Sequence, residues 1–243
     1  MNTDISKVYT TKFFEAQADG SASSASVVVP LFLSFCPVRS VADVGCGIGT
    51  WTQAFLAHGV PDVLGVDGDY VTKSELRIPP ERFHCHDLTK PLQLNRTFDL
   101  AVCLEVAEHL PESRACTLVR DLTSLAPCVL FSAAIPGQGG TNHINEQHLS
   151  FWVSLFEDRG YTGLDALRPH LFGNDSVEWW YQQNMVVFAA AGHRLLSRGF
   201  PKPADWIHRQ LYDQTRNEPS LRLVMHGFPG AVLRAVRHRL RLP

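Results

Sequence analysis

A glycine-rich segment and an acidic residue downstream of it have the types and spacing of a nucleotide-like binding site. Gly45, Gly47 and Gly49 directly follow the apolar run 41–44. Glycines let the backbone turn sharply and approach a ligand without an intervening Cβ atom, and the helix expected next begins with free N–H groups. Asp67 ends the next apolar run, where a carboxylate can accept hydrogen bonds from both hydroxyls of a ribose. The two features together predict a site for an adenosine-type ligand.

A second group of residues could handle a proton or hold a cation. Glu105, Glu108 and His109 lie within five residues of one another, and His143 lies in the polar, glycine-rich stretch 136–147. A neutral imidazole is suited to accept a proton near pH 7, so His143 is our first candidate for a catalytic base and His109 is its rival. Oxygen and imidazole groups also suit Mg²⁺ or Mn²⁺. We expect no metal, with a divalent ion at Glu105, Glu108 and His109 as the alternative.

The elements that must position these residues follow from alternating apolar runs and helical patterns. We expect strands at 41–44, 63–66, 82–86, 98–104, 128–135, 162–167 and 184–190, and helices at 50–58, 112–125 and 149–159. Such alternation predicts an α/β fold, a mostly parallel sheet covered by helices on both faces. Ligands of these sheets bind beyond the carboxyl ends of the strands.

The order and spacing of these segments resemble the class I S-adenosylmethionine-dependent methyltransferases. Residues 43–49, Asp-Val-Gly-Cys-Gly-Ile-Gly, are similar to the first motif of that family, and Asp67 matches its ribose-binding acid. Asp87 resembles the acid that contacts the adenine amino group, and 98–111 resembles the fourth motif. The resemblance extends over residues 25–190. Nicotinamide dehydrogenases share part of the pattern, but they prefer a third glycine where this chain has Thr50.

The phrases at 63–70, 132–136 and 139–147 also resemble a bacterial methyltransferase subfamily of undefined substrate. The resemblance implies a Rossmann-like, doubly wound, seven-stranded sheet with the last strand antiparallel, S-adenosylmethionine as cofactor and S-adenosylhomocysteine as product. It implies cofactor binding by Asp43, Gly45, Cys46, Gly47, Gly49, Asp67, Gly68, Asp87, Leu88 and Glu105. We expect an N-terminal helical lid at 1–35, the cofactor-binding domain at 36–191 and a basic helical extension at 192–243.

Charge is unevenly distributed over a chain whose net charge is −2. Residues 1–191 have 12 Lys and Arg against 21 Asp and Glu, whereas residues 192–243 have 10 against 3. The acidic catalytic part is a poor match for a polyanion, which argues against nucleic acid as the partner. The pattern at 231–242 predicts a short amphipathic, arginine-rich helix that docks on the domain or a second subunit, or binds an anionic partner.

Composition points to a folded, reduced protein. The polar start lacks a signal-peptide core, and the most apolar stretch, 27–38, is too short to span a bilayer. We therefore expect a cytoplasmic protein. The six cysteines contain no CxxC pair and are expected to be free thiols.

The function predicted is methyl transfer from S-adenosylmethionine to a small-molecule acceptor, at oxygen rather than nitrogen or carbon. Alternatives are a metal-assisted RNA 2′-O-methyltransferase, a non-catalytic cofactor-binding module and a nicotinamide oxidoreductase. The aromatic residues 179–181 fit either an acceptor pocket or the core. The acceptor and the oligomeric state stay open, homo-oligomers included.

Overall fold

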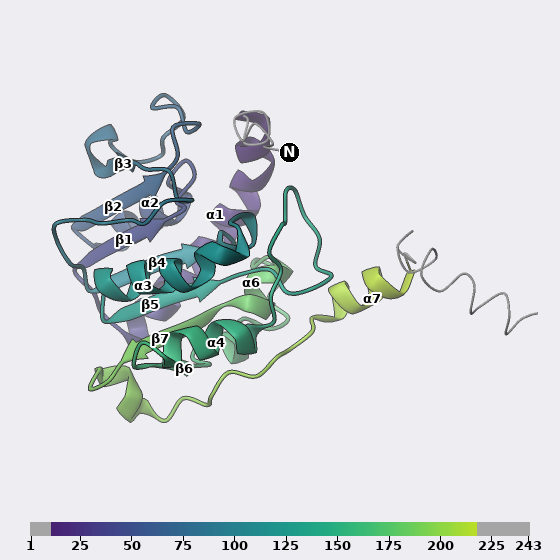
Figure 1. Ribbon diagram of the computed structural model, residues 1–243. Coiled ribbons are helices and arrows are strands. Elements are labelled where there is room, and N and C mark those ends of the chain that lie inside the picture. The colour runs from purple at the N-terminus through teal and green to yellow at the C-terminus, as the bar shows by residue number, and fades with distance from the viewer. Residues whose placement is uncertain (1–10, 218–243) are drawn as a thin grey trace, which may run out of the picture. The chain divides into compact units, whose positions relative to one another are not determined.

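The computed structural model describes residues 11–217, with side chains from residue 19 to residue 215. The chain divides into two compact units, Met1–Trp206 and Ile207–Pro243. The first unit contains a seven-stranded sheet in the order β3-β2-β1-β4-β5-β7-β6 (Figure 1). The strands are β1 (Ser40–Val44), β2 (Asp62–Asp67), β3 (Phe83–Cys85), β4 (Leu100–Leu104), β5 (Cys128–Ser132), β6 (Tyr161–Leu164) and β7 (Val186–Ala190). β7 is antiparallel to both of its neighbours, and the other pairs are parallel, which confirms the predicted fold.

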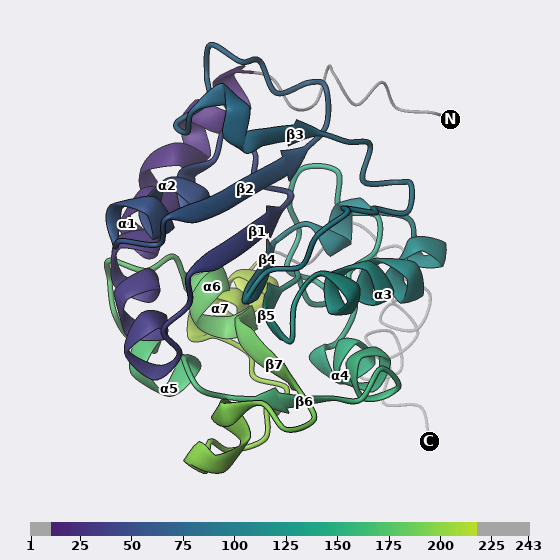
Figure 2. The same ribbon diagram turned by 90° about the vertical axis from the view of Figure 1, so that its left-hand side faces the viewer.

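Helices cover both faces of the sheet, because its central strands are buried on both sides. Figure 2 shows α1 (Thr11–Phe35) and α2 (Thr50–Ala57) on one face and α3 (Ala115–Leu125) and α4 (Leu149–Glu157) on the other. The first face buries a core that includes Phe32 and Phe55. The second buries Phe131, Trp152 and Phe156.

The remaining elements are short, and of these only the one at Glu112–Arg114 lies within a helix that the sequence predicts, at 112–125. They are η2 (Pro80–Arg82), η3 (Ala107–His109), η4 (Glu112–Arg114), α5 (Arg168–Leu171), α6 (Trp179–Asn184), η5 (Arg194–Arg198) and α7 (Arg209–Asn217). The fifth strand ends at Ser132 and not at residue 135, since the chain turns there into the loop that contains Pro136.

The lid prediction for residues 1–35 is wrong for the second half of α1. Ala25, Val28, Val29 and Phe32 recur at helical spacing and are at most 1% exposed, so this face of α1 is part of the core. One face of the apolar stretch 27–38 is thus buried in the protein. Among the described residues, no helix is both long and apolar enough to cross a membrane.

The predicted start of the C-terminal extension at residue 192 is also wrong. Leu195 is buried in the core, and the carbonyl of Pro201 accepts a hydrogen bond from the backbone of Asp165 at 2.8 Å. The guanidinium of Arg168 donates to the Ala204 carbonyl at 2.9 Å and lies 4.4 Å from the ring centroid of Trp206. Residues 192–206 therefore belong to the sheet unit.

The second unit begins at Ile207. Its helix α7 has an ion pair between Arg209 and Asp213, with 3.5 Å between Nε and Oδ2. The predicted basic helix at 231–242 lies outside the described residues.

Candidate active site

The turn between β1 and α2 requires glycine at its alternate positions. Gly45, Gly47 and Gly49 have φ angles of 82°, 53° and 86°, a region that L side chains rarely adopt. A Cβ atom on Gly45 would lie 2.3 Å from a methyl group of Val106. Helix α2 follows without a side-chain cap, which leaves its first N–H groups free for an anionic or polar ligand. The turn is therefore a cradle that only glycine can form.

Asp67 lies at the carboxyl end of β2, next to this turn. Its carboxylate accepts hydrogen bonds from the backbone N–H groups of Gly47, at 2.6 Å, and Gly68, at 2.7 Å. The hydroxyl of Tyr70 also donates to it. Burial raises the pKa of Asp67, since a charged carboxylate loses solvation inside the protein. These contacts fix the carboxylate at the edge where a ribose would lie.

Cys46 has a packing role in the same turn. Its side chain lies against Gly65, where a Cβ atom would be 2.7 Å from the Cys46 sulfur. Burial raises the pKa of Cys46 well above that of a free thiol, so the group stays neutral. The backbone of Cys46 remains part of the cradle.

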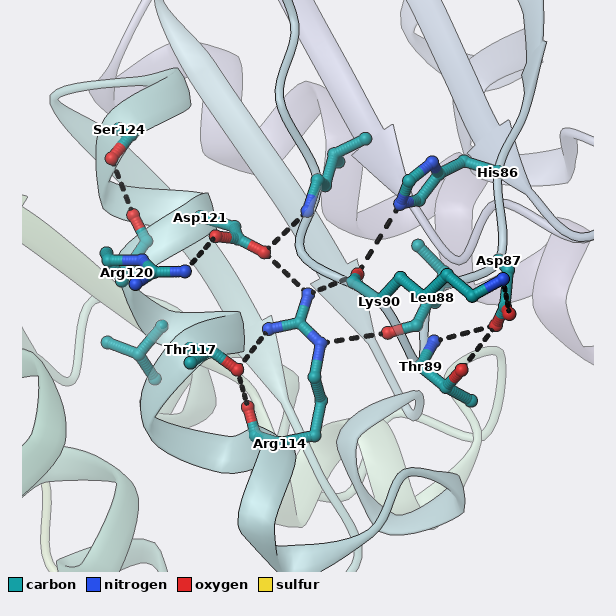
Figure 3. A network of polar contacts seen from close by, with 12 residues as sticks. His86, Asp87, Leu88, Thr89, Lys90, Arg114, Thr117, Arg120, Asp121 and Ser124 are labelled. Carbon is teal, nitrogen blue, oxygen red and sulfur yellow. Dashed lines mark hydrogen bonds and ion pairs between the residues drawn. The ribbon is translucent and has the colours of Figure 1, made fainter.

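Asp87 and Leu88 follow β3, and Arg114 holds their loop in place (Figure 3). The buried Arg114 guanidinium donates to the carbonyls of Leu88 and Lys90, both at 3.0 Å. It also pairs with Asp121 of α3 at 2.5 Å. The Asp87 carboxylate accepts from the Thr89 backbone and hydroxyl, and the hydroxyl bond is the main cause of its lowered pKa. Arg114 was not predicted, because the loop carbonyls to which it donates lie 24 to 26 residues away in the chain.

Arg114→Met is expected to weaken binding of S-adenosylhomocysteine about tenfold, since loss of two charged hydrogen bonds frees the loop at Leu88. Thr117→Val is the matched control, because it removes a hydroxyl that accepts from the Arg114 guanidinium at 2.7 Å and donates to the Arg114 carbonyl at 2.9 Å, both outside that loop. Calorimetric titration of both variants checks this. Equal affinities for Arg114→Met and Thr117→Val would contradict the role of Arg114.

Asp43 lies inside β1, and the Thr52 hydroxyl donates to it at 2.6 Å. Burial raises the pKa of Asp43 to about 7. Above about pH 4 the unfolded chain has lost this proton, whereas the folded protein retains it. The folded state therefore binds more protons between about pH 4 and pH 7, and the contribution of Asp43 to the free energy of unfolding falls as the pH rises through this window.

Asp43→Asn is expected to raise the free energy of unfolding at pH 8 by up to about 4 kcal/mol, because the amide keeps an acceptor for Thr52 and has no charge to bury. The gain should vanish near pH 4. Denaturant unfolding at both pH values checks this, with the exposed Asp69→Asn as control. A gain that is the same at both pH values would contradict it.

Glu105 follows β4 with a φ angle of 52°, which is strained for a residue other than glycine. Its carboxylate accepts hydrogen bonds from Gln138 at 3.1 Å and from Asn184 at 3.2 Å. Burial raises the pKa of Glu105. Gln138 and Asn184 were not predicted, since they come from a loop and from α6, far away in the chain.

Glu108, His109 and His143 meet next to Glu105. One carboxylate oxygen of Glu108 and one ring nitrogen of each histidine lie within 4.8 Å of one another. The two imidazole rings are 4.9 Å apart, edge to face. From the sequence, we expected the two histidines to be rival bases. The alternative metal site contained His109 with Glu105 and Glu108. The structure instead joins His143 to Glu108 and His109.

The carboxylate of Glu108 is fully buried, and neither of its oxygens accepts a hydrogen bond from any described residue. Burial raises its pKa well above the usual range, and the neighbouring Glu105 adds to the shift. Burial and the adjacent His143 lower the pKa of His109 to about 4, so its imidazole is neutral at pH 7. A buried carboxylate without donors is costly unless a cation compensates it. The group therefore fits a divalent cation.

Glu146 organises the loop that contains His143. Its two oxygens accept from the backbone N–H groups of Gly137 and Gly139, at 2.8 and 2.7 Å. One of them lies 3.0 Å from Nδ1 of His143. As a carboxylate it accepts that contact from an N–H group, which leaves Nε2 of His143 with a lone pair.

Two residues of the aromatic segment 179–181, Trp180 and Tyr181, pack in or against the core. Tyr181 is buried in the core, and its hydroxyl accepts from Trp51 Nε1 at 3.3 Å. Trp180 packs against the same core. The interpretation as core holds for these two residues.

The sequence matches the methyltransferase-domain family over residues 14–184. Ubiquinone biosynthesis O-methyltransferase of Coxiella burnetii is 30% identical over 83 residues, which are 30% of this chain and 34% of the relative. The chain thus matches about a third of the length of such curated relatives.

Solved structures agree with the fold. Magnesium protoporphyrin IX methyltransferase from Synechocystis PCC 6803 with bound S-adenosylhomocysteine superposes with a TM-score of 0.56 at 18% identity, covering 77% of this chain and 98% of that one. An O-methyltransferase family protein from Burkholderia thailandensis gives 0.53 at 16% identity, covering 74% and 59%. The chain therefore belongs to the methyltransferase-domain family, with a class I fold and S-adenosylmethionine as its cofactor.

Proposed function

We propose that this protein transfers the methyl group of S-adenosylmethionine to an oxygen atom of a small-molecule acceptor, with a divalent cation held by Glu108, His109 and His143. The observation that supports the cation is the buried Glu108 carboxylate, which accepts no hydrogen bond from the described residues and lies beside two imidazoles. The O-methyltransferase names among the relatives support oxygen as the acceptor atom.

In this proposal the residues of the chain mainly bind and orient the cofactor and the acceptor. When bound, the cofactor supplies a methyl group already activated on a sulfonium. The turn at Gly45–Gly49 and the carboxylate of Asp67 hold the cofactor, and Leu88 frames its adenine. Glu105, held by Gln138 and Asn184, closes the inner edge of the site.

Glu108, His109 and His143 face the acceptor side. A cation there would supply charge that favours the ionised form of an acceptor hydroxyl. Mixed oxygen and imidazole groups suit Mg²⁺ or Mn²⁺. Glu146 holds the His143 ring in place through Nδ1. In this proposal Nε2 is the ring nitrogen that binds the cation.

A metal-free reaction uses the same atoms differently. Nε2 of His143 would then accept the proton of the acceptor hydroxyl, with His109 packed against its ring. The two mechanisms differ in their response to a chelator, since only the first loses activity without a cation.

The experiment uses the purified full chain with methyl-labelled S-adenosylmethionine. A panel of phenols, catechols, hydroxy acids and a short RNA is incubated with EDTA, with Mg²⁺ or with Mn²⁺, and the products are identified by mass spectrometry. We expect O-methylation of a small hydroxyl compound that EDTA abolishes and the cation restores. Methylation that persists in EDTA would favour His143 as the base. Methylation of RNA alone, or binding of cofactor without turnover on any acceptor, would contradict the proposal.

A further inference from the structure

Two cysteines meet at the amino end of β5, the end of the strand opposite to the candidate active site. Cys36 follows α1, Cys128 begins β5, and His193 follows β7. Both cysteines are free and fully buried. Their sulfur atoms and one ring nitrogen of His193 lie within 4.8 Å of one another. Three segments far apart in the chain thus place two thiols in contact.

The charges around the pair make its two sulfurs unequal. Nη2 of Arg194 lies 3.4 Å from Sγ of Cys36 and also donates to the Pro37 carbonyl. The hydrogen bond from Cys128 and the nearby guanidinium lower the pKa of Cys36 to about 6, although burial and Asp99 oppose the shift. The pKa of Cys128 is raised well above its usual value. At neutral pH the pair is therefore a thiolate next to a thiol.

Hydrogen bonds hold two other polar side chains near the pair in place. Nδ1 of His193 accepts the backbone N–H of Leu195 at 3.3 Å, and Asp99 is held by the backbone N–H groups of Arg39 and Ser40. The positive charge of Arg194 beside the sulfur favours a thiolate and opposes a metal cation at the same atoms.

We propose that Cys36 and Cys128 form a peroxide-oxidised dithiol site, in which a hydroperoxide converts the pair to a disulfide. The Cys36 thiolate attacks one oxygen of hydrogen peroxide, the O–O bond breaks, and hydroxide leaves, so that Cys36 becomes a sulfenic acid. The Cys128 sulfur then attacks the Cys36 sulfur. An S–S bond forms, the S–O bond breaks, and the oxygen leaves as water with the Cys128 proton. Two thiols are oxidised and one peroxide is reduced.

The disulfide would link α1 to the central strand β5. Helix α1 contacts α6 as well, since the Ser24 hydroxyl accepts the backbone N–H of Glu178 at 3.0 Å. A cross-link between residues so far apart restricts the unfolded chain strongly. The oxidised protein should therefore unfold at a higher temperature than the reduced one.

The experiment treats the reduced full chain with stoichiometric hydrogen peroxide, blocks the remaining thiols and maps peptides without reduction. We expect a linked peptide of Cys36 and Cys128 that has lost two hydrogens, with Cys85 and Cys116, the exposed cysteines, still alkylated. Cys36→Ser and Cys128→Ser should each abolish the link and the rise in melting temperature. Preferential oxidation of Cys85 or Cys116, or one equivalent of co-purified zinc that protects the pair, would overturn the proposal.

The pH dependence separates an activated thiolate from two thiols that merely touch. The rate of linking should rise with pH with a midpoint near 6 in the wild-type protein. In Arg194→Gln the midpoint should move to higher pH and the rate at pH 6 should fall several-fold, because the thiolate loses its neighbouring charge. An unchanged midpoint in Arg194→Gln would show that Arg194 does not activate Cys36.

Discussion

Replacing Asp67 with alanine is expected to weaken S-adenosylhomocysteine binding at least a hundredfold. A carboxylate that accepts two ribose hydroxyls makes two charge-assisted hydrogen bonds, each with a net value of about 1.5–3 kcal/mol. Their loss corresponds to a factor of about a hundred to a few tens of thousands in Kd. In the structure the carboxylate is already held by the backbone of Gly47 and Gly68, so it is pre-organised for this contact.

Calorimetric titration checks the prediction, and two variants control for a collapsed turn. Tyr70→Phe removes a hydroxyl that donates to the same carboxylate, so its affinity should equal or exceed that of the wild type. Asp67→Asn keeps the volume but loses the charge and one acceptor, and it should fall between the wild type and Asp67→Ala. NAD should not bind to any of them. Wild-type affinity in a folded Asp67→Ala protein would show that Asp67 has only a structural role.

Glu108→Gln is expected to stabilise the protein without a cation and to abolish its response to one. The buried carboxylate accepts no hydrogen bond from the described residues, and burial raises its pKa, so its neutral amide counterpart is cheaper to bury. The same substitution removes the negative charge that a cation needs. Relative to the wild type, Glu108→Gln should therefore be more stable in EDTA and less stable in saturating Mn²⁺.

The melting temperature in EDTA and in Mn²⁺ measures both effects. A cation at a hundred times its Kd stabilises the wild type by about 2.7 kcal/mol, which is about 5–10 °C for a domain of this size. Glu108→Gln should melt higher than the wild type in EDTA and show no shift with Mn²⁺. The exposed Glu112→Gln is the matched control and should respond like the wild type. A full Mn²⁺ shift in Glu108→Gln would show that the cation binds somewhere other than at Glu108.

Local patterns in the sequence determined the fold class and predicted the residues of the candidate cofactor side of the site. The glycines at 45, 47 and 49, Asp67 and Asp87 lie at or just after the carboxyl end of a strand, so local structure decides where each of them lies. Parallel strands end at a common edge, which is why these local signals combine into one site. The number of strands and the antiparallel last strand followed from the family resemblance, whereas the strand order came from the structure.

Only the tertiary structure brought together the residues of the proposed acceptor side. Leu104 of β4 pairs with Ser132 of β5, and this register brings the loops after the two strands together. His143 therefore meets Glu108 and His109 across more than thirty residues of chain, a contact that no local pattern encodes.

The structure also reassigned the two ends of the sheet unit. Half of α1 belongs to the core because it covers one face of the sheet. Residues 192–206 belong to the sheet unit because Asp165 and Arg168 donate hydrogen bonds to their backbone carbonyls. The contact between Cys36 and Cys128 has the same origin. Local propensities place residues along one element, whereas strand register and helix packing decide which elements meet.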